Sequence, residues 1–408
     1  MLPNVKIDFA NGLLGAVGAM NDGVVGLIAT ATAVTQTING NSVTTFALNT
    51  PYKITALDQL VEKGINSAST GANANLYKCV KEFYDEAPGG SELWIMGVAD
   101  TMTVDKMVDK TEANGAKKLV SAANGDIRIL IVKVTDASGY SATVTHAIDA
   151  KVETAITNAQ ALAEEATSAL YAPLFVILEG RHYSGVASSL PQLDEGNENR
   201  VAVLIGDTVA NSKGAAVGLL AGRIAAIPVQ RSIGRVRSGK IVATTLYIGS
   251  VTAENGDPGT INDAGFICPR TFVGKSGYFW SDDKLATAST DDYALIPRRR
   301  TIDKAYRIAY QTLVDTLNDE VPVTDEGKIA PPYVKSVEAA VESAIINLMT
   351  SEGNLGVDPS DPNDMGVQCY INPDQNIVAT SKLKVKLRVK PYGYAKYIEV
   401  DLGFKVSE

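Results

Sequence analysis

The chain has 408 residues, of which 45% are hydrophobic and 20% are charged, and its formal net charge is -9. This balance is typical of a folded protein with a large core and excludes an intrinsically disordered chain. Nucleic-acid binding and attraction to anionic membranes depend on Lys and Arg, so the negative charge gives no electrostatic reason to expect either partner. Length alone predicts two or three domains.

The N-terminal residues contain no basic segment ahead of an apolar stretch, so we expect no secretory signal and synthesis in the cytoplasm. The most apolar stretch, residues 13–34, is interrupted by Asn21 and Asp22 and is rich in Gly, Ala and Thr, which argues against direct membrane insertion. The sequence has three cysteines and two histidines, and the cysteines are far apart with no Cys-x-x-Cys pair. We therefore expect no disulfide framework, no metal site and no cofactor.

The first element along the chain is a predicted strand. Val5, Ile7 and Phe9 alternate with polar residues, which is the period of a half-buried strand. The stretch behind it, to about residue 49, is rich in Gly, Ala, Thr and Asn and has no helical period. Strands or an extended linker fit that stretch better than a helix.

From residue 55 to about residue 209, helical patterns alternate with short apolar runs. Such alternation predicts an α/β domain with a largely parallel sheet that is covered on both faces. The apolar runs lie at residues 93–98, 127–134, 174–178 and 201–205, and the helical patterns lie at 55–64, around Leu76, Val80 and Phe83, at 147–170 and at 212–226.

After Pro228 the pattern changes to turns and strands, around residues 241–251 and 266–273. Two strong helical patterns follow, at residues 302–317 and from Pro331 to Leu348, with a stop at Gly353.

The C-terminal segment contains two alternating patterns. In the first, the apolar residues Leu383, Val385, Leu387 and Val389 alternate with the basic residues Lys384, Lys386, Arg388 and Lys390. In the second, Ile398, Val400, Leu402 and Phe404 alternate with positions that include Glu399 and Asp401. Opposite charges on paired strands help to fix register, each pair contributing about 0.2 to 1 kcal/mol. Both ends of the chain are therefore strand-like, and an isolated strand needs the edge of a sheet.

Several stretches in the second half of the chain carry a family resemblance. They are Gly222-Arg223-Ile224-Ala225-Ala226 with Pro228, the run Arg298-Arg299-Arg300 that opens a helix, Gly353-Asn354-Leu355-Gly356 after the next helix, Val367-Gln368-Cys369-Tyr370, and Leu387-Arg388-Val389-Lys390-Pro391 leading into Tyr397-Ile398-Glu399-Val400. In this order, over nearly half of the chain, they resemble the tube-proximal domain of contractile tail sheath proteins. Residues 278–283 depart from the Trp-Gly-Ala-Arg-Thr-like stretch of many sheaths, which points to a divergent bacterial or phage branch.

The resemblance implies a fold of the class α/β plus α+β, in which a tube-proximal, handshake-type α+β domain has terminal β-strand arms and an inserted α/β domain. It implies these boundaries: an N-terminal strand arm at residues 1–20, an outer α/β domain with linker at 21–226, a tube-proximal sheath domain at 227–382 and a C-terminal strand arm at 383–408.

The resemblance also implies a structural role without enzyme activity. Sheath subunits polymerise helically around an inner tube and contract to drive it through a target envelope, and their terminal strands add to sheets of neighbouring subunits. The implied partners are neighbouring sheath subunits, an inner tail tube protein, and baseplate and terminator proteins. Assembly is expected in the bacterial cytoplasm, as part of a virion tail or of a released or cytoplasmic contractile particle.

Two groups of residues would carry that role. The intersubunit strand arms would use the apolar residues of the alternating patterns, Val5, Ile7, Phe9, Leu383, Val385, Leu387, Val389, Ile398, Val400, Leu402 and Phe404. The candidate contacts with the tube or a neighbour are the basic residues Lys384, Lys386, Arg388, Arg299 and Arg300, although a solvated surface is the alternative for the basic strand face.

Four short motifs that could indicate a cofactor, a metal ion or catalysis are incomplete. Gly12-x-x-Gly15-x-x-Gly18 misses the spacing of a dinucleotide loop, and Gly274-Lys275-Ser276 lacks the first glycine of a phosphate loop because residue 269 is Pro. Asp358, Asp361 and Asp364 are spaced too widely for a calcium loop. His146 and His182 have no nucleophile at motif spacing.

Two other functions remain open from the sequence. One is an α/β enzyme that binds a nucleotide or small molecule in residues 55–226, although no complete catalytic motif supports it. The other is a non-contractile structural tail or surface protein.

Overall fold

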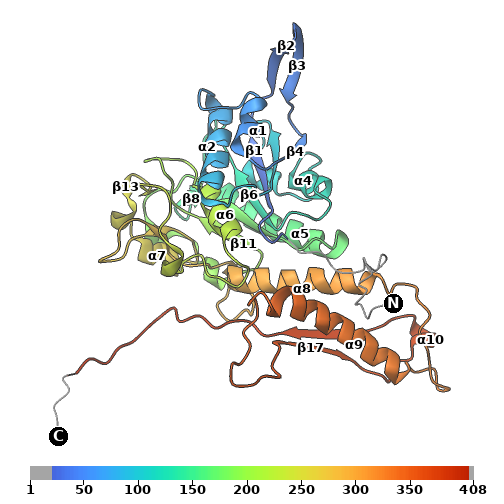
Figure 1. Ribbon diagram of the computed structural model, residues 1–408. Coiled ribbons are helices and arrows are strands. Elements are labelled where there is room, and N and C mark those ends of the chain that lie inside the picture. Colours follow the sequence, from blue (N-terminus) through green and yellow to red (C-terminus); the bar gives the residue numbers. More distant parts are fainter. Residues whose placement is uncertain (1–20, 404–408) are drawn as a thin grey trace, which may run out of the picture. The chain divides into compact units, whose positions relative to one another are not determined.

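The computed structural model of the protein describes residues 21–403, and the chain forms two compact units, Met1–Glu320 and Val321–Glu408 (Figure 1). The predicted boundary near residue 226 does not separate compact units. Residues 227–320 pack with the first unit because the Ile267 backbone pairs with Val203 and Ile205, with N···O distances of 2.9 Å for both bonds. The expected N-terminal strand, with Val5, Ile7 and Phe9, lies outside the described residues, as does Phe404.

A six-stranded sheet forms the centre of unit 1. Its order is β11-β9-β6-β1-β5-β4, and all neighbours are parallel except β4, which is antiparallel to β5. Every residue of β1, β6, β9 and β11 is buried, as expected for strands covered on both faces. The strands are β1 (Val25–Thr30), β4 (Pro51–Ile54), β5 (Leu93–Val98), β6 (Ile129–Lys133), β9 (Phe175–Glu179) and β11 (Val201–Leu204).

The four apolar runs predicted as strands are confirmed as β5, β6, β9 and β11. The central strand β1 falls in the stretch for which strands or linker were predicted.

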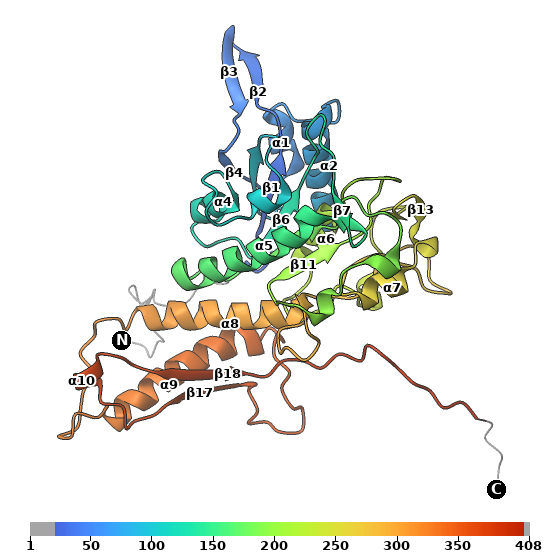
Figure 2. The same cartoon turned by 180° about the vertical axis from the view of Figure 1, so that it is seen from behind.

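Helices lie on both sides of this sheet (Figures 1 and 2). Helices α2 and α6 pack against each other at close range: a Cβ on Gly222 would lie 2.5 Å from the Phe83 carbonyl oxygen. On α5, the Asp149 side chain caps the first turn by accepting from the Lys151 backbone N–H. The helices are α1 (Leu57–Glu62), α2 (Gly71–Glu86), α3 (Val104–Met107), α4 (Ala116–Ala122), α5 (Ala150–Ala169) and α6 (Val217–Ala226).

The rest of unit 1 consists of short pairings and one long helix, α8 (Ile296–Val314). A hairpin of β2 (Val34–Ile38) and β3 (Asn41–Phe46) projects from the body of the unit (Figure 1). Strands were predicted around residues 241–251 and 266–273. The structure has only two-residue strands in these regions, because turns interrupt them. The remaining elements are β7 (Val144–Thr145), β8 (Ile148–Asp149), β10 (Asn197–Glu198), β12 (Tyr247–Ile248), β13 (Val251–Thr252), β14 (Pro269–Arg270), β15 (Phe279–Trp280), β16 (Ala286–Thr287), α7 (Pro258–Asp263) and the 3-10 turns Ala187–Ser189, Leu193–Glu195, Val236–Ser238 and Ala253–Asn255.

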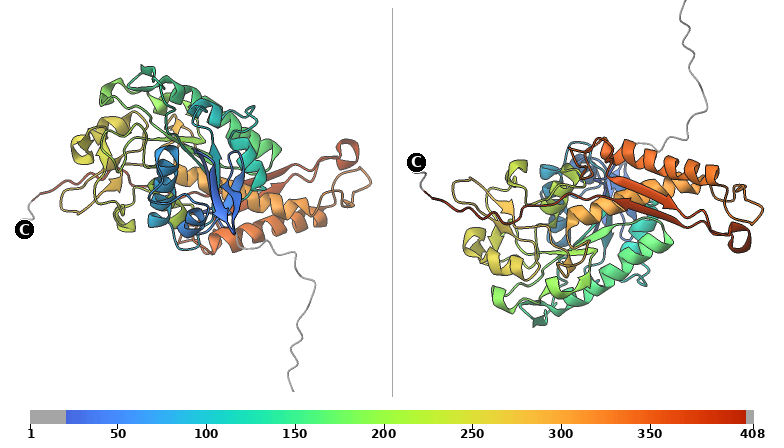
Figure 3. Two further views of the ribbon diagram at one scale, coloured as in Figure 1. Left: turned by 90° about the horizontal axis from the view of Figure 1, so that it is seen from above. Right: turned by 90° about the horizontal axis from the view of Figure 1, so that it is seen from below.

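Unit 2 is built on one helix and a two-stranded antiparallel sheet. Helix α9 (Pro331–Ile345), extended by a π turn (Ile346–Thr350), lies along β17 (Val367–Ile371) and β18 (Val385–Val389) (Figure 3). Between β17 and β18 the chain forms α10 (Ile377–Thr380). The predicted helix from Pro331 and the predicted alternating strand are confirmed.

The interface between α9 and the sheet has an apolar centre. The residues Val334, Val337, Val341, Ile345, Cys369 and Ile371 are buried there. Within residues 21–403, no helix combines the length and the apolar character needed to cross a membrane.

Candidate assembly surfaces

The sheet of unit 2 has one apolar and one basic face. Register pairs Gln368 with Arg388 and Tyr370 with Lys386, on the face opposite to Cys369 and Leu387. Because Cys369 is buried on the α9 side, these four side chains point away from the helix, and all four are exposed. The predicted basic strand face therefore exists as a surface. Whether it meets a tube or a neighbour stays a prediction.

The structure corrects the extent of the predicted C-terminal arm. The apolar residues Val385, Leu387 and Val389 lie on β18, which pairs with β17 of the same chain, and Leu383 directly precedes this strand. They therefore complete the chain's own sheet rather than belonging to a donated strand. Alternation predicts a strand but does not say whose sheet it joins.

The segment after β18 contains a second alternating pattern, at residues 397–403. It runs away from the β17–β18 sheet as an extended trace (Figures 1 and 2). Ile398, Val400 and Leu402 are 79%, 76% and 91% exposed, and among the described residues no strand pairs with residues 397–403. Three apolar side chains at alternate positions in water indicate a face that another surface covers.

Arg299 and Arg300, predicted as contact residues, are instead interior residues of unit 1. They are 7% and 5% exposed. Arg299 Nη2 donates to Asp303 Oδ1 at 2.6 Å, and its guanidinium lies over the Tyr293 ring at 4.4 Å from the centroid.

Arg300 donates to the carbonyl oxygens of Ile227 at 3.2 Å and Pro228 at 3.3 Å. Burial lowers the pKa of Arg300 to about 10, with Asp22 acting in the opposite direction. The basic run at the start of α8 therefore holds the fold together, and the prediction of surface contacts for these two residues is wrong.

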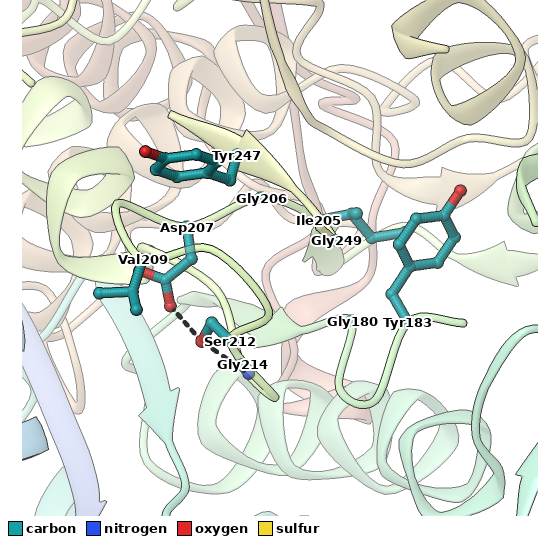
Figure 4. Close-up of a pocket in the computed structure, with 10 residues that line it drawn as sticks. All are labelled: Gly180, Tyr183, Ile205, Gly206, Asp207, Val209, Ser212, Gly214, Tyr247 and Gly249. Carbon is teal, nitrogen blue, oxygen red and sulfur yellow. Dashed lines mark hydrogen bonds between the residues drawn. The ribbon is translucent and has the colours of Figure 1, made fainter. Parts of the chain in front are cut away.

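The rival enzyme function would place a ligand at the carboxyl ends of the parallel strands, where strand order reverses between β1 and β6. Figure 4 shows a hollow at this edge, in which the Asp207 carboxylate accepts a hydrogen bond from the Ser212 hydroxyl at 2.6 Å. Its volume of about 10 Å³ is close to the minimum for one water molecule. A neighbouring open hollow of about 300 Å³ is lined by charged residues that include Lys78, Lys133 and Arg181.

The charges at this edge form a buried network. Glu179, at the end of β9, accepts from Lys133 Nζ at 2.6 Å and from Arg181 Nη1 at 3.1 Å. Its oxygens also accept from the backbone N–H groups of Val134 and Ala215, both at 2.8 Å. Arg181 pairs in turn with Asp136 at 2.6 Å.

The network keeps its members ionised. Burial alone would raise the pKa of the Glu179 carboxyl, but Lys133 and Arg181 outweigh it and hold that pKa below its ordinary value. Burial would likewise lower the pKa of the Lys133 amine, but Glu179 and Asp207 reverse this and raise it. Neither group is poised to exchange a proton near neutral pH, so the arrangement is that of a structural network.

The aspartate and histidine residues singled out in the sequence make local hydrogen bonds and ion pairs. The carboxylates of Asp358, Asp361 and Asp364 each accept from a backbone N–H two residues further on, at 2.9 Å in every case. His146 pairs with Glu153, and His182 with Asp136.

No group of three or more potential metal ligands occurs in the part of the chain that the structure describes. Gly274-Lys275-Ser276 lies in a loop directly after Val273, and the Gly12 to Gly18 motif lies outside the described residues.

Sequence reasoning missed Glu338 and Glu342 on α9. Their carboxylates accept from the backbone N–H groups of Ile371 at 2.8 Å and Cys369 at 2.7 Å, along the outer edge of β17. The only signal in the sequence was two glutamates four residues apart in a helix that is otherwise apolar on its buried face.

Comparison with known proteins places the chain in a family. A model described as "DUF2586, N-terminal domain" matches residues 2–284, and one described as "DUF2586, C-terminal domain" matches residues 292–408. Among curated proteins, no sequence matches this chain.

Solved structures share its fold at low sequence identity. The sheath complex of the extracellular contractile injection system PVC, in its contracted state, has a TM-score of 0.63 and 13% identity, covering 100% of this chain and 98% of that chain. The baseplate of the anti-feeding prophage AFP contains a chain with a TM-score of 0.60 and 14% identity, covering 100% and 99%. The sheath tail protein from Desulfitobacterium hafniense has a TM-score of 0.50 and 12% identity, covering 95% and 100%.

These similarities confirm the predicted resemblance to sheath proteins at the level of a mixed α/β fold. By the match of its two domain models over nearly its whole length, the chain belongs to the DUF2586 family.

Proposed function

We propose that this chain is the structural subunit of a contractile sheath, which polymerises helically around an inner tube and contracts to drive that tube through a target envelope. The observation that carries the proposal is the fold similarity to the PVC sheath in its contracted state, which extends over 100% of this chain. A similarity that spans both units is more informative than one confined to the α/β sheet, because doubly wound sheets host many unrelated functions.

The physical basis of assembly is strand addition between copies. Residues 397–403, with Ile398, Val400 and Leu402 exposed, have the alternation of a strand, and no strand among residues 21–403 pairs with them. Main-chain hydrogen bonds to a neighbour's sheet would satisfy it, and head-to-tail contacts that do not close generate a helical tube. Contraction is then a rigid-body rearrangement between two packings of the same subunits, with the segments between unit and donated strand as hinges.

Finer features belong to the same proposal. Unit 2 is the core of the handshake-type domain, the outer α/β domain is inserted before it, and the termini are the donated arms, at residues 1–20 and after β18. The other partners are an inner tube protein and baseplate and terminator proteins. Assembly takes place in the bacterial cytoplasm, in a virion tail or in a released or cytoplasmic contractile particle.

A structural role without catalysis is supported by the charged edge of the sheet. Lys133, Glu179 and Arg181 occupy the place where an α/β enzyme binds its ligand, and each is committed to buried partners. No observation favours the enzyme.

Electron microscopy of the expressed protein tests the proposal. A sheath subunit forms hollow, striated tubes or sheath-like polymers, an enzyme forms discrete particles, and a non-contractile tail protein forms tubes of one fixed pitch. Removing residues 395–408, which lie beyond β18, should abolish polymers and leave the thermal unfolding of both units unchanged. Discrete particles from the full-length chain under all assembly conditions would contradict the proposal.

A further inference from the structure

The two outer edges of the unit 2 sheet differ in their hydrogen bonding. The Lys390 backbone N–H donates to the Gly366 carbonyl oxygen at 2.8 Å, in the same register as the β17–β18 ladder. Hydrogen-bonded pairs alternate along an antiparallel ladder, so Gln368–Arg388 and Tyr370–Lys386 exchange hydrogen bonds. The residues between them turn their N–H and C=O groups outward. These residues are Val367, Cys369 and Ile371 on β17, and Val385, Leu387 and Val389 on β18.

On β17, side-chain carboxylates accept from two of the three outward N–H groups. Glu342 Oε1 accepts from the Cys369 N–H at 2.7 Å, and Glu338 Oε1 accepts from the Ile371 N–H at 2.8 Å. One helical turn from residue 338 to 342 rises about 6 Å, and alternate residues of a strand lie roughly 6.6 to 6.8 Å apart, so the two spacings match. The carboxylate oxygens stand where the carbonyl oxygens of a third strand would lie.

Glu338 is held firmly in this position. It is 5% exposed, and its second oxygen pairs with Lys335 Nζ at 2.7 Å. Hydrogen bonds to an ionised acceptor are roughly twice as strong as neutral ones. A strand arriving at β17 would therefore exchange two strong bonds for two weaker ones.

On β18 the edge is open. Among the described residues, no acceptor bonds to the outward N–H groups of Val385, Leu387 or Val389. The Arg388 guanidinium donates to the outward Leu387 carbonyl oxygen at 3.2 Å, so an arriving strand has to displace this one exposed side chain but no buried acceptor.

We propose that residues 397–403 of a second copy of this chain add to the outer edge of β18 and not to that of β17. The inference rests on the proposed sheath function and specifies the docking edge.

The side chains of the incoming segment fit this edge only when its apolar residues lie on the apolar face of the sheet. Strand addition places Ile398, Val400 and Leu402 on the face that carries Val385, Leu387 and Val389, next to α9. The same period places Glu399 and Asp401 beside the basic residues Lys384, Lys386 and Arg388. A slip of one residue would bring the acidic side chains to the apolar face, so both charge and hydrophobicity select this arrangement.

Cysteine pairs test the choice of edge. Directly opposite Cβ atoms on neighbouring strands lie about 4.5 to 5.5 Å apart, whereas a strand once removed lies roughly 10 Å away, beyond the reach of a disulfide. Glu399→Cys and Asp401→Cys variants are each mixed with Lys384→Cys, Lys386→Cys or Arg388→Cys variants for the β18 edge, and with Gln368→Cys or Tyr370→Cys variants for the β17 edge. The assembled material is oxidised and run on a non-reducing gel.

We expect crosslinked dimers from at least one β18 mixture and none from the β17 mixtures. The unsubstituted chain, whose three cysteines are buried, is the background control. Crosslinks from the β17 mixtures, or none from any mixture in material that forms tubes, would overturn the edge assignment and leave the sheath function standing. Absence of tubes from the full-length chain contradicts the sheath function and this inference with it.

Removing the carboxylates tests their role separately. Glu338→Ala together with Glu342→Ala should free the β17 edge, so that a crosslink to Tyr370→Cys appears beside the β18 product. Glu338→Gln together with Glu342→Gln is the matched control, because an amide oxygen still accepts the two N–H bonds. A β17 edge that stays uncrosslinked in the alanine variant, when that variant assembles, would contradict the blocking role.

Discussion

Two strands of the unit 1 sheet end in opposite charges, Lys133 on β6 and Glu179 on β9. Both side chains are buried, at 4% and 1% exposure, and they meet at 2.6 Å. In sequence each appears as a single charge that follows an apolar run. Parallel strands bring their carboxyl ends to the same edge of the sheet, so the two charges could have been predicted to lie at one edge. Which strands would be neighbours was not readable from one sequence.

Replacing Lys133 with Met should strongly destabilise unit 1. The substitution leaves the buried Glu179 carboxylate without its nearest cation, and breaking a buried pair from one side costs about 3–5 kcal/mol. Urea unfolding measures the loss as a lower midpoint.

Lys117→Met is the matched control. Lys117 pairs with Glu165 at the same distance of 2.6 Å, but the two side chains are 40% and 26% exposed. A surface pair contributes about 1 kcal/mol or less. Equal losses from the two substitutions would contradict the assigned role of the network.

The same network predicts how stability depends on pH. For Glu179 and Asp207, burial alone would raise the carboxyl pKa, but Lys133 and further cations lower it below its ordinary value. The unfolded chain therefore binds protons more readily, so this contribution is complete above the ordinary carboxyl pKa of about 4 and is lost as pH falls below it.

Thermal unfolding between pH 7 and pH 3 checks this. The melting temperature should fall below pH ~4–5, and the fall should be shallower in Lys133→Met, because Glu179 then has a less depressed pKa. Parallel curves for the two proteins would show that the pair does not contribute to the pH dependence.

At the scale of the element, the packing of α2 against α6 depends on glycine. A Cβ on Gly222 would lie 2.5 Å from the Phe83 carbonyl oxygen and 2.8 Å from the Glu86 Cβ, inside the distance of any real contact. Gly218 faces the Cys79 carbonyl in the same way. The glycines allow two helix backbones to approach closely.

Gly222→Ala should therefore destabilise unit 1 by about 1–3 kcal/mol, the usual loss on overpacking. Intrinsic helix propensity acts in the opposite direction and favours Ala by about 1 kcal/mol, so the sign of the measured change separates the two effects.

Gly259→Ala is the control within a helix. Gly259 lies in α7, and the nearest atom to an added Cβ is 4.0 Å away. This substitution should be neutral or slightly stabilising. A rise in melting temperature for Gly222→Ala would contradict the close packing of α2 and α6.

Elements with a clear apolar signal were predictable from the sequence. The runs that became β5, β6, β9 and β11 are apolar because both of their faces are buried, so position and type were both readable. The central strand β1 was harder to assign, since its Gly, Ala and Thr residues resemble those of the linker-like stretch around it.

Helix α8 shows why its buried residues were misassigned. Its inward positions include Ile296, Arg299, Arg300, Asp303 and Arg307, which recur at the helical period but are mostly charged. A search for hydrophobic periodicity does not detect a buried helix face whose residues are charged. Its partners come from distant parts of the sequence: Arg200 pairs with Asp303 at 3.1 Å, and the Ile227 carbonyl oxygen accepts from Arg300 at 3.2 Å.

At the scale of the whole molecule, the C-terminal segment is the feature that a single folded copy does not explain. Its alternation was predicted from the sequence, and the structure leaves its apolar side chains in water. Sequence alone did not distinguish β18, which completes the chain's own sheet, from the segment that follows, because both alternate equally well. The difference lies in pairing: β18 is hydrogen-bonded to β17, which packs against α9 in the same unit, whereas residues 397–403 have no such strand pairing.

If the C-terminal segment binds the sheet of a neighbouring copy, it should bind there even as a free peptide. A synthetic peptide of residues 395–408, added in excess to full-length subunits before assembly, should occupy the sheet edge that a neighbour's segment would take. The peptide has no body to carry the lattice onward, so it should shorten tubes and raise the soluble fraction with increasing concentration.

Sedimentation and electron microscopy give these two measures. The matched control is the same peptide with Ile398→Ser, Val400→Ser and Leu402→Ser, which keeps the length and the charges but removes the apolar face; it should leave assembly unchanged. Equal tube lengths with both peptides at saturating excess would contradict strand donation by this segment.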